Sequence, residues 1–141
     1  MTRIFFYHNA VDRIVAAALL LGKTYQQGKA ILVYAPEAKL TEQIDRQLWL
    51  TPPTGFIPHA RDTSPLAAET PIVITTDIAD SAQNERLLIL SVDVPPAFSR
   101  FTSVVEVVGQ DSGERREAHE RAKFYRERGY AIKFDFAEKF S

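Results

Sequence analysis

The chain has 141 residues, and its 17 Lys and Arg against 18 Asp and Glu give a formal net charge of −1. This near-neutral balance excludes a global electrostatic attraction to a nucleic-acid backbone, so any basic surface is local. The sequence has no cysteine, which excludes disulfides, a thiol nucleophile and a cysteine-based zinc site. The longest apolar run, residues 14–21, is far shorter than the ~20 residues of a membrane span, so we expect no contact with a membrane. The length predicts one domain over residues 1–141, and we expect it in the cytoplasm.

The first half of the chain predicts two strands that alternate with two helices. Short apolar runs predict strands at residues 3–8 and 29–35, the second without alternation and therefore buried on both faces. An Ala- and Leu-rich stretch predicts a helix over residues 12–27, with Asp12 as its N-cap. A second helix is expected over residues 37–49. Four-residue spacing predicts the buried stripe of this second helix: Leu40, Ile44 and Leu48.

The second half predicts three further strands, a charged helix and a final strand. Apolar runs predict strands at residues 72–76, 87–94 and 104–108. A charged helix is expected to run to about residue 128, with Asp111 or Ser112 as its cap. Residues 130–136 alternate apolar and polar side chains, which is typical of a strand at the edge of a sheet.

The connections between these elements are rich in turn-forming residues. Residues 56–58 are expected to form a short strand or an extended loop, and residues 59–71 mostly turns. Phe98 and Phe101 are expected to anchor a short helical turn. The alternation of strands and helices predicts a layered α/β fold, Rossmann-like in outline, whose central and mostly parallel sheet is flanked by helices. Such folds often bind nucleotides, and a nucleotide site needs a phosphate-binding motif.

Gly22-Lys23-Thr24 resembles the end of a Walker A loop, in which Lys and Thr contact phosphate and Mg²⁺. Ala17 occupies the position of the first Gly of that motif, and the triplet lies near the end of a predicted helix. The sequence has no Gly-x-Gly-x-x-Gly motif either. We therefore expect no cofactor. The fold pattern and this triplet still leave a small nucleotide-binding or hydrolytic α/β enzyme as an alternative to a protein without catalytic activity.

The sequence predicts no catalytic residues and no metal site. His8, His59 and His119 are far apart, and none has the spacing of a zinc motif on one helix. No serine lies in a Gly-x-Ser-x-Gly turn. The scattered acidic residues fit solvated turns and helix caps better than general acid–base chemistry.

The end of the second predicted helix offers a candidate apolar surface. Trp49 falls about 180° from Leu40 around the helix axis, away from the buried stripe. Prolines and apolar residues follow within ten positions, and an exposed patch of this kind marks a partner site with Trp as its anchor. The alternative is that the helix ends at Leu48 and that Trp49 folds back into the core.

The charged helix offers a second candidate surface. One of its faces gathers four basic residues without an acid: Arg115, His119, Lys123 and Arg126. The neighbouring face holds small and aromatic residues: Ala118, Ala122 and Tyr125. A basic stripe beside an apolar floor suits an acidic peptide or a carboxylate. The alternatives are a solvated helix face and a salt-sensitive contact with bare DNA.

Four parts of the sequence, in their order and spacing, carry a resemblance to a known family: Leu48-Trp49, Phe56-Ile57-Pro58-His59, Phe101-Thr102-x-Val104-Val105-Glu106 and Arg121-x-Lys123-x-Tyr125-Arg126-x-x-Gly129-Tyr130. Together they resemble the chi subunit of bacterial DNA polymerase III. The resemblance spans the whole chain. It implies an α/β protein without enzymatic activity of its own, which acts in the clamp-loader part of the replicative polymerase.

The resemblance also implies partners and contact residues. Members of that family link the clamp-loader complex, through its psi subunit, to the single-stranded-DNA-binding protein, so they contact DNA only indirectly. The recognised segment is the acidic C-terminal tail of that protein, which ends in Pro-Phe. The implied psi-binding residues are Trp49, Phe56, Ile57 and Pro58. The implied tail-binding residues are Val108, Arg115, His119, Ala122, Lys123 and Arg126.

The chain departs from the family pattern at two of these positions. His119 stands where better-known members carry an Arg, and Ala122 stands where they carry an aromatic residue. A neutral imidazole is a weaker partner for a carboxylate than a guanidinium. We therefore expect weaker and pH-sensitive tail binding.

Overall fold

The computed structural model describes residues 1–141 except 51–56, 68–69, 80–82 and 138–141. In the described part, seven parallel strands form one sheet in the order β3-β4-β2-β5-β6-β1-β7. The strands are β1 (Arg3–Ala10), β2 (Ile31–Tyr34), β3 (His59–Arg61), β4 (Ile72–Thr75), β5 (Arg86–Ile89), β6 (Ser103–Gly109) and β7 (Ile132–Phe136). The helices are α1 (Arg13–Gln26), α2 (Ala38–Leu50), the 3₁₀ helix η2 (Pro96–Arg100) and α3 (Ser112–Glu127). The predicted α/β fold is confirmed.

Two helices begin at the side-chain caps that the sequence predicts. Asp12 caps α1 by accepting hydrogen bonds from the backbone amides of Ile14 and Val15, at 3.0 and 3.1 Å. Asp111 caps α3 in the same way. Gly129 follows the end of α3 with a φ of 84°, a left-handed conformation that glycine adopts without strain. These local signals fix where the two longest helices start and where α3 stops.

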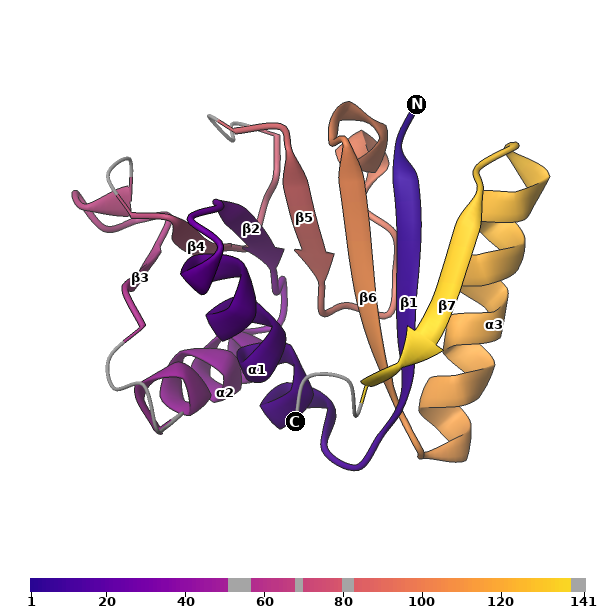
Figure 1. The fold of residues 1–141 in the computed structure, drawn as a ribbon, viewed down its shortest axis with the longest axis horizontal. Helices are drawn as coiled ribbons and strands as arrows, with labels where there is room; N and C mark the ends of the chain where they lie inside the picture. The colour runs from indigo at the N-terminus through magenta and orange to yellow at the C-terminus, as the bar shows by residue number, and fades with distance from the viewer. Residues whose placement is uncertain (51–56, 68–69, 80–82, 138–141) are drawn as a thin grey trace.

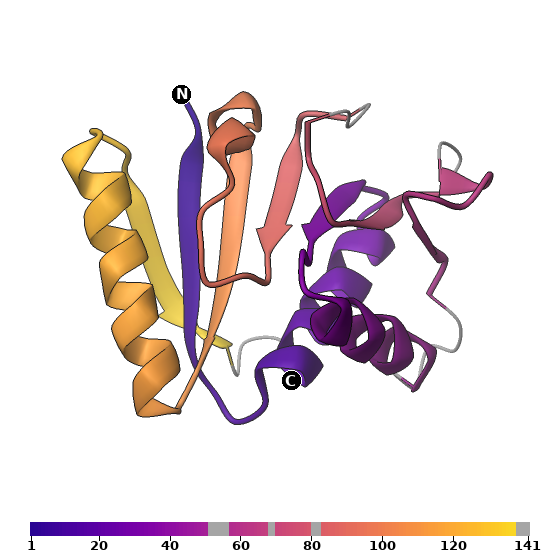
Figure 2. The ribbon, with the colours of Figure 1, turned by 180° about the vertical axis from the view of Figure 1, so that it is seen from behind.

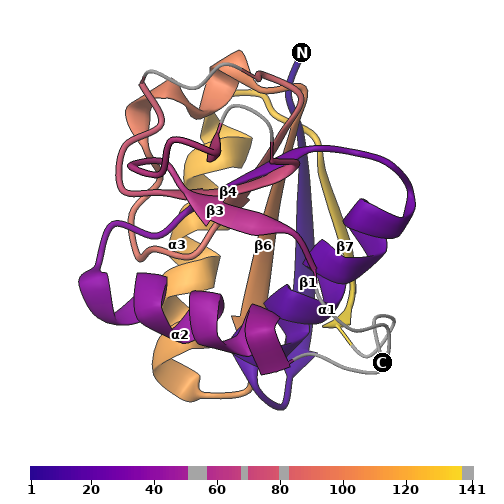
Figure 3. The same ribbon diagram turned by 90° about the vertical axis from the view of Figure 1, so that its left-hand side faces the viewer.

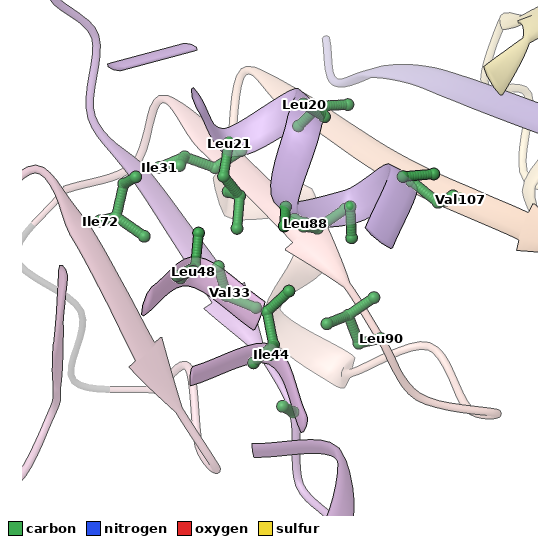
Figure 4. Close-up of a cluster of buried hydrophobic side chains, with 14 of the residues drawn as sticks. Leu20, Leu21, Ile31, Val33, Ile44, Leu48, Ile72, Leu88, Leu90 and Val107 are labelled. Carbon is green, nitrogen blue, oxygen red and sulfur yellow. The ribbon is translucent and has the colours of Figure 1, made fainter. Parts of the chain in front are cut away.

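Helices cover both faces of the sheet (Figures 1 and 2). In the view turned by 90°, α1 and α3 lie on opposite sides of β6 and β1 (Figure 3). One hydrophobic cluster fills the space between α1, α2 and the sheet (Figure 4). Its largest members include Leu20, Leu21, Ile44, Leu48, Ile31, Val33, Ile72 and Leu88. The predicted stripe of the second helix is confirmed at Ile44 and Leu48, which are fully buried, whereas Leu40 is partly buried.

A second cluster packs α3 and η2 against the other face. It joins Phe98 and Phe101 to the inward-facing side chains of β1, β5 and β6 and to Tyr125 of α3. The expected helical turn around Phe98 and Phe101 is therefore present as η2. Within the described residues, no helix is long and apolar enough to cross a bilayer.

Two predictions about strands are wrong, because contacts between distant parts of the chain decide the structure there. Residues 59–71 were expected as turns, yet His59–Arg61 forms β3 through parallel pairing with β4, a contact that local sequence does not encode. The strand expected at residues 87–94 ends at Ile89. Leu90 still donates a hydrogen bond to the Tyr34 carbonyl at 2.9 Å, but its apolar character reflects burial rather than strand structure.

Candidate functional site

A pocket of about 270 Å³ opens between α3 and the edge of the sheet formed by β1 and β7. Four elements line it: β1, β6, α3 and β7. The lining residues are Phe6, His8, Val108, Arg115, Ala118, His119, Ala122, Arg126 and Phe134.

The floor and walls of the pocket are apolar. Val108, Ala118 and Ala122 are buried at its base, and the two alanines leave the space that larger side chains would fill. The rings of Phe6 and Phe134 lie 5.5 Å apart between centroids. Phe134 is 48% exposed, so its ring forms an open wall that a ligand side chain reaches.

The rim of the pocket is basic. Arg115, His119 and Arg126 are exposed on α3, and the Arg126 guanidinium lies 5.5 Å from the centroid of the Phe134 ring. No Asp or Glu is among the lining residues that the structure describes. Charge-assisted hydrogen bonds from such a rim suit an anion whose neighbouring side chain fills the apolar floor.

The structure brings five of the six expected tail-binding residues into this pocket: Val108, Arg115, His119, Ala122 and Arg126. Lys123 is different. Its side chain is 70% exposed, its Nζ lies 3.9 Å from Glu127 Oε1, and it is not a lining residue. The basic stripe predicted from helical periodicity is therefore split, because Lys123 points to solvent beside the pocket.

The sequence reasoning did not place Phe6, His8 and Phe134 at this site. Alternation predicted that Phe134 and Phe136 share a face, but the parallel pairing of β1 with β7 joins the first and last strands of the chain. That pairing is non-local, and no motif in either strand reveals it.

The pairing of β1 with β6 is irregular near the end of β1, next to His8. The register moves from Tyr7 opposite Val107 to Ala10 opposite Gly109, so β1 carries one extra residue. Asn9 absorbs it with a φ of 64°, in the left-handed region. His8 lies before this bulge beside Phe136, with 4.6 Å between ring centroids, and lines the pocket.

The second expected surface, around Trp49, is only partly supported. Trp49 is 62% exposed and α2 continues to Leu50, so its predicted outward orientation is confirmed and the alternative of a buried Trp is wrong. Pro58 is half-buried, and Phe56 lies outside the described residues. Ile57 is 2% exposed and belongs to the core beside α1 and α2. Its assignment to an exposed apolar surface is therefore wrong.

His59 joins the Trp49 surface to the rest of α2. Its ring lies edge-on to the Trp49 ring, with 5.4 Å between centroids. The Nδ1 atom is 2.7 Å from the Ile57 carbonyl, and Nε2 is 2.9 Å from Asp45 Oδ1. These contacts tie His59 to α2 and to the backbone of the buried Ile57.

The structure assigns Gly22-Lys23-Thr24 a packing role. The triplet lies inside α1, and Thr24 donates its hydroxyl hydrogen to the Leu20 carbonyl at 3.0 Å. A Cβ at Gly22 would lie 3.3 Å from Cδ1 of Ile57, so glycine makes room for that core side chain. A Walker A loop precedes its helix, and the alternative of a nucleotide-binding enzyme loses the motif on which it rested.

Comparison with known proteins decides the family. The family model described as DNA polymerase III chi subunit, HolC, matches residues 1–133. The chain belongs to this family. A chi subunit is an accessory subunit of a polymerase complex, so the interpretation of the chain as a protein without its own catalytic site agrees with its family.

Three proteins named DNA polymerase III subunit chi are similar to this chi-family chain. The one from Pseudomonas aeruginosa is 26% identical over 136 residues, which covers 94% of each chain. The one from Haemophilus influenzae is 29% identical over 117 residues, covering 82% of this chain and 81% of the relative. The one from Escherichia coli is 26% identical over 125 residues, covering 88% and 84%.

Three residues of the chi-family pattern form a buried network where α3 packs on the sheet. The Arg121 guanidinium pairs with Oε1 of Glu106, and the Tyr125 hydroxyl donates to Oε2 of the same carboxylate at 2.7 Å. Glu106 and Tyr125 are fully buried and Arg121 nearly so. Arg121 also donates to the Val92 carbonyl at 3.2 Å.

Burial sets the protonation behaviour of this network. It raises the pKa of Glu106 above its usual value, while Arg121 and the hydrogen bond from Tyr125 oppose that rise. Burial and the adjacent Glu106 raise the pKa of Tyr125, so its hydroxyl keeps its proton. The network thus holds α3 in one position against the sheet. Because α3 forms one side of the pocket, the network also fixes the position of the pocket-lining residues on this helix.

Proposed function

We propose that this chain is a non-catalytic accessory subunit that links the clamp loader to the acidic C-terminal tail of the single-stranded-DNA-binding protein. The clamp-loader contact runs through the psi subunit of DNA polymerase III. Membership of the chi family supports a place in the bacterial replicative holoenzyme. In this role the chain works as one domain over residues 1–141 in the cytoplasm, contacts DNA only indirectly and needs no cofactor.

The pocket beside α3 is the observation that carries the tail-binding part of the proposal. It combines an apolar floor large enough for a side chain with two arginines at its rim and no acidic lining residue in the described structure. A tail that ends in Phe supplies an aromatic ring beside a terminal carboxylate. The ring would occupy the floor near Val108 and Ala122, and the carboxylate would accept hydrogen bonds from Arg115 or Arg126.

The exposed Trp49 surface supports the psi contact. Trp49 and Leu50 are both 62% exposed at the end of α2, and a protruding Trp is a common interface anchor. Helix α2 lies toward the β3–β4 side of the sheet, whereas α3 lies toward β7 (Figure 1). The two surfaces are therefore separate, and both partners would bind at the same time.

Calorimetric titration tests the tail contact. The full chain is titrated with an acidic peptide that ends in Asp-Asp-Ile-Pro-Phe and with the same peptide lacking the final Phe. Binding that disappears without the Phe would support the proposal. Equal binding of both peptides would reduce the contact to charge attraction, and no binding of either would overturn the tail-binding role.

A further inference from the structure

Two of the three histidines in the chain line the same pocket. His8 comes from the end of β1 and His119 from the middle of α3, so they face the pocket from different elements. The third, His59, lies on the Trp49 side of the molecule, where it contacts Asp45. The pocket is therefore lined by two imidazoles that come from different elements.

We propose that His8 is a ligand-contacting residue of this pocket and that, together with His119, it makes capture of an acidic peptide depend on protonation. The inference rests on the proposed tail-binding function. It predicts tighter binding at pH 6 than at pH 8, and it adds a residue from β1 to a contact surface otherwise assigned to α3 and β6.

The backbone around His8 supports a binding role. His8 precedes Asn9, whose left-handed conformation is uncommon for a residue other than glycine. Conformations of this kind cluster at ligand sites, where the surrounding structure holds them in place. The ring of His8 lies between the pocket and Phe136, and its centroid is 6.5 Å from that of Phe134. The regular pairing of β1 with β7 places the imidazole of His8 opposite Phe136 and on the same face of the sheet as Phe6 and Phe134.

The charges around the two imidazoles are all positive at the pocket lining. Arg115 and Arg126 come from α3, while β1, β6 and β7 contribute the uncharged Phe6, Val108 and Phe134. Along α3, Arg116 and Lys123 lie one turn before and after His119. The carboxylate of Asp135 on β7 lies on the other face of the sheet, beside Phe5, Tyr7 and Lys133. Since the described lining residues include no acid, a bound peptide would bring an acidic partner to the two imidazoles.

Proton linkage follows from this arrangement. A carboxylate within a few ångströms of an imidazole favours its charged form, so binding takes up protons and weakens as pH rises. The carboxylates of an acidic peptide are ionised at both pH 6 and pH 8. An exposed pair of this kind strengthens binding about two- to fivefold, so two imidazoles predict roughly a tenfold rise in affinity from pH 8 to pH 6.

The test is calorimetric titration of the full chain with the acidic peptide ending in Pro-Phe, at pH 6 and pH 8 and at constant ionic strength. At each pH, two buffers of different ionisation enthalpy report the number of protons taken up, which needs no variant. His8→Gln and His119→Gln remove one titratable ring each. His119→Arg locks a positive charge, and His59→Gln is the matched control outside the pocket. Circular dichroism checks that every variant is folded.

We expect the wild type to bind about tenfold tighter at pH 6 and to take up protons, and each Gln variant to lose part of that difference. His119→Arg should bind at pH 8 nearly as the wild type does at pH 6, and His59→Gln should behave like the wild type. Equal affinity at both pH values without proton uptake would overturn the inference and leave the tail-binding function standing. Full pH dependence in His8→Gln would overturn the role of His8. Absence of binding at both pH values would instead overturn the proposed function.

Discussion

Replacing Arg121 by Met tests how α3 is held on the sheet. The substitution keeps a long unbranched side chain and removes the guanidinium, so the fully buried Glu106 loses its cationic partner. Removal of one partner from a buried pair costs about 3–5 kcal/mol, a large part of the ~5–15 kcal/mol that stabilises a domain. Tyr125→Phe removes one hydrogen bond to the same carboxylate and should cost about 1.5–3 kcal/mol.

The destabilisation by Arg121→Met should depend on pH in a defined direction. Arg121 lowers the pKa of Glu106 and burial raises it, so without Arg121 the folded-state pKa lies further above the unfolded value. An acid of this kind binds more protons when folded, and its contribution to stability falls as pH rises from the unfolded pKa toward the folded one. The variant should therefore lose more stability at pH 8 than at pH 5.

Urea unfolding followed by far-ultraviolet circular dichroism measures both effects. Arg116→Met is the matched control, since Arg116 is exposed on the same helix and its loss should change stability by less than about 0.5 kcal/mol. The double variant Glu106→Leu with Arg121→Met should recover much of the loss, because no unpaired buried charge remains. A loss below about 1 kcal/mol at pH 8, with no change at pH 5, would show that Glu106 is neutral in the folded protein and needs no cation.

Three further outcomes follow from the same structure. In calorimetry, Arg126→Glu should weaken binding of the acidic peptide at least about tenfold, and Lys123→Glu less than about threefold, because Arg126 lines the pocket and Lys123 does not. Equal losses of affinity in the two variants would refute that distinction. Trp49→Ala should leave the free energy of unfolding within about 0.5 kcal/mol and weaken capture of psi, whereas Ile57→Ala should cost about 2–4 kcal/mol in urea unfolding. Asp12→Ala should cost about 1 kcal/mol in the same assay through loss of the α1 cap, and an unchanged midpoint would contradict the capping role.

Local sequence signals predicted the helices better than the strand pairing. Asp12 marks the start of α1 because a cap acts within three residues of itself. The basic and apolar faces of α3 were likewise predictable, since helical periodicity alone places Arg115 beside Ala118 and Ala122. By contrast, β3 exists only because β4 offers a partner, and its three residues carry no strand pattern of their own.

The same distinction explains the errors at the two candidate surfaces. Ile57 follows Trp49 closely in sequence, but Ile57 is buried in the core. His59, two residues later, is hydrogen-bonded to Asp45 of α2 and to the Ile57 carbonyl. His8 and Phe134 reach the pocket through pairing of the first and last strands. Each case includes a contact between residues distant in sequence, His59 with Asp45 and β1 with β7, and a linear pattern does not reveal such contacts.

Helix α3 carries the buried network on one of its faces and the basic pocket rim on another. Arg121 and Tyr125 face inward from α3 to Glu106, whereas Arg115, His119 and Arg126 face the pocket. The inward residues hold the helix in position on the sheet, and the outward residues are the ones that a ligand would contact. Of the pocket-lining residues that the structure describes, only Arg126 belongs to the family pattern, so the resemblance says little about the chemistry of the pocket. That chemistry depends on residues such as His8 and Phe134, which lie outside the pattern and must be tested in this chain itself.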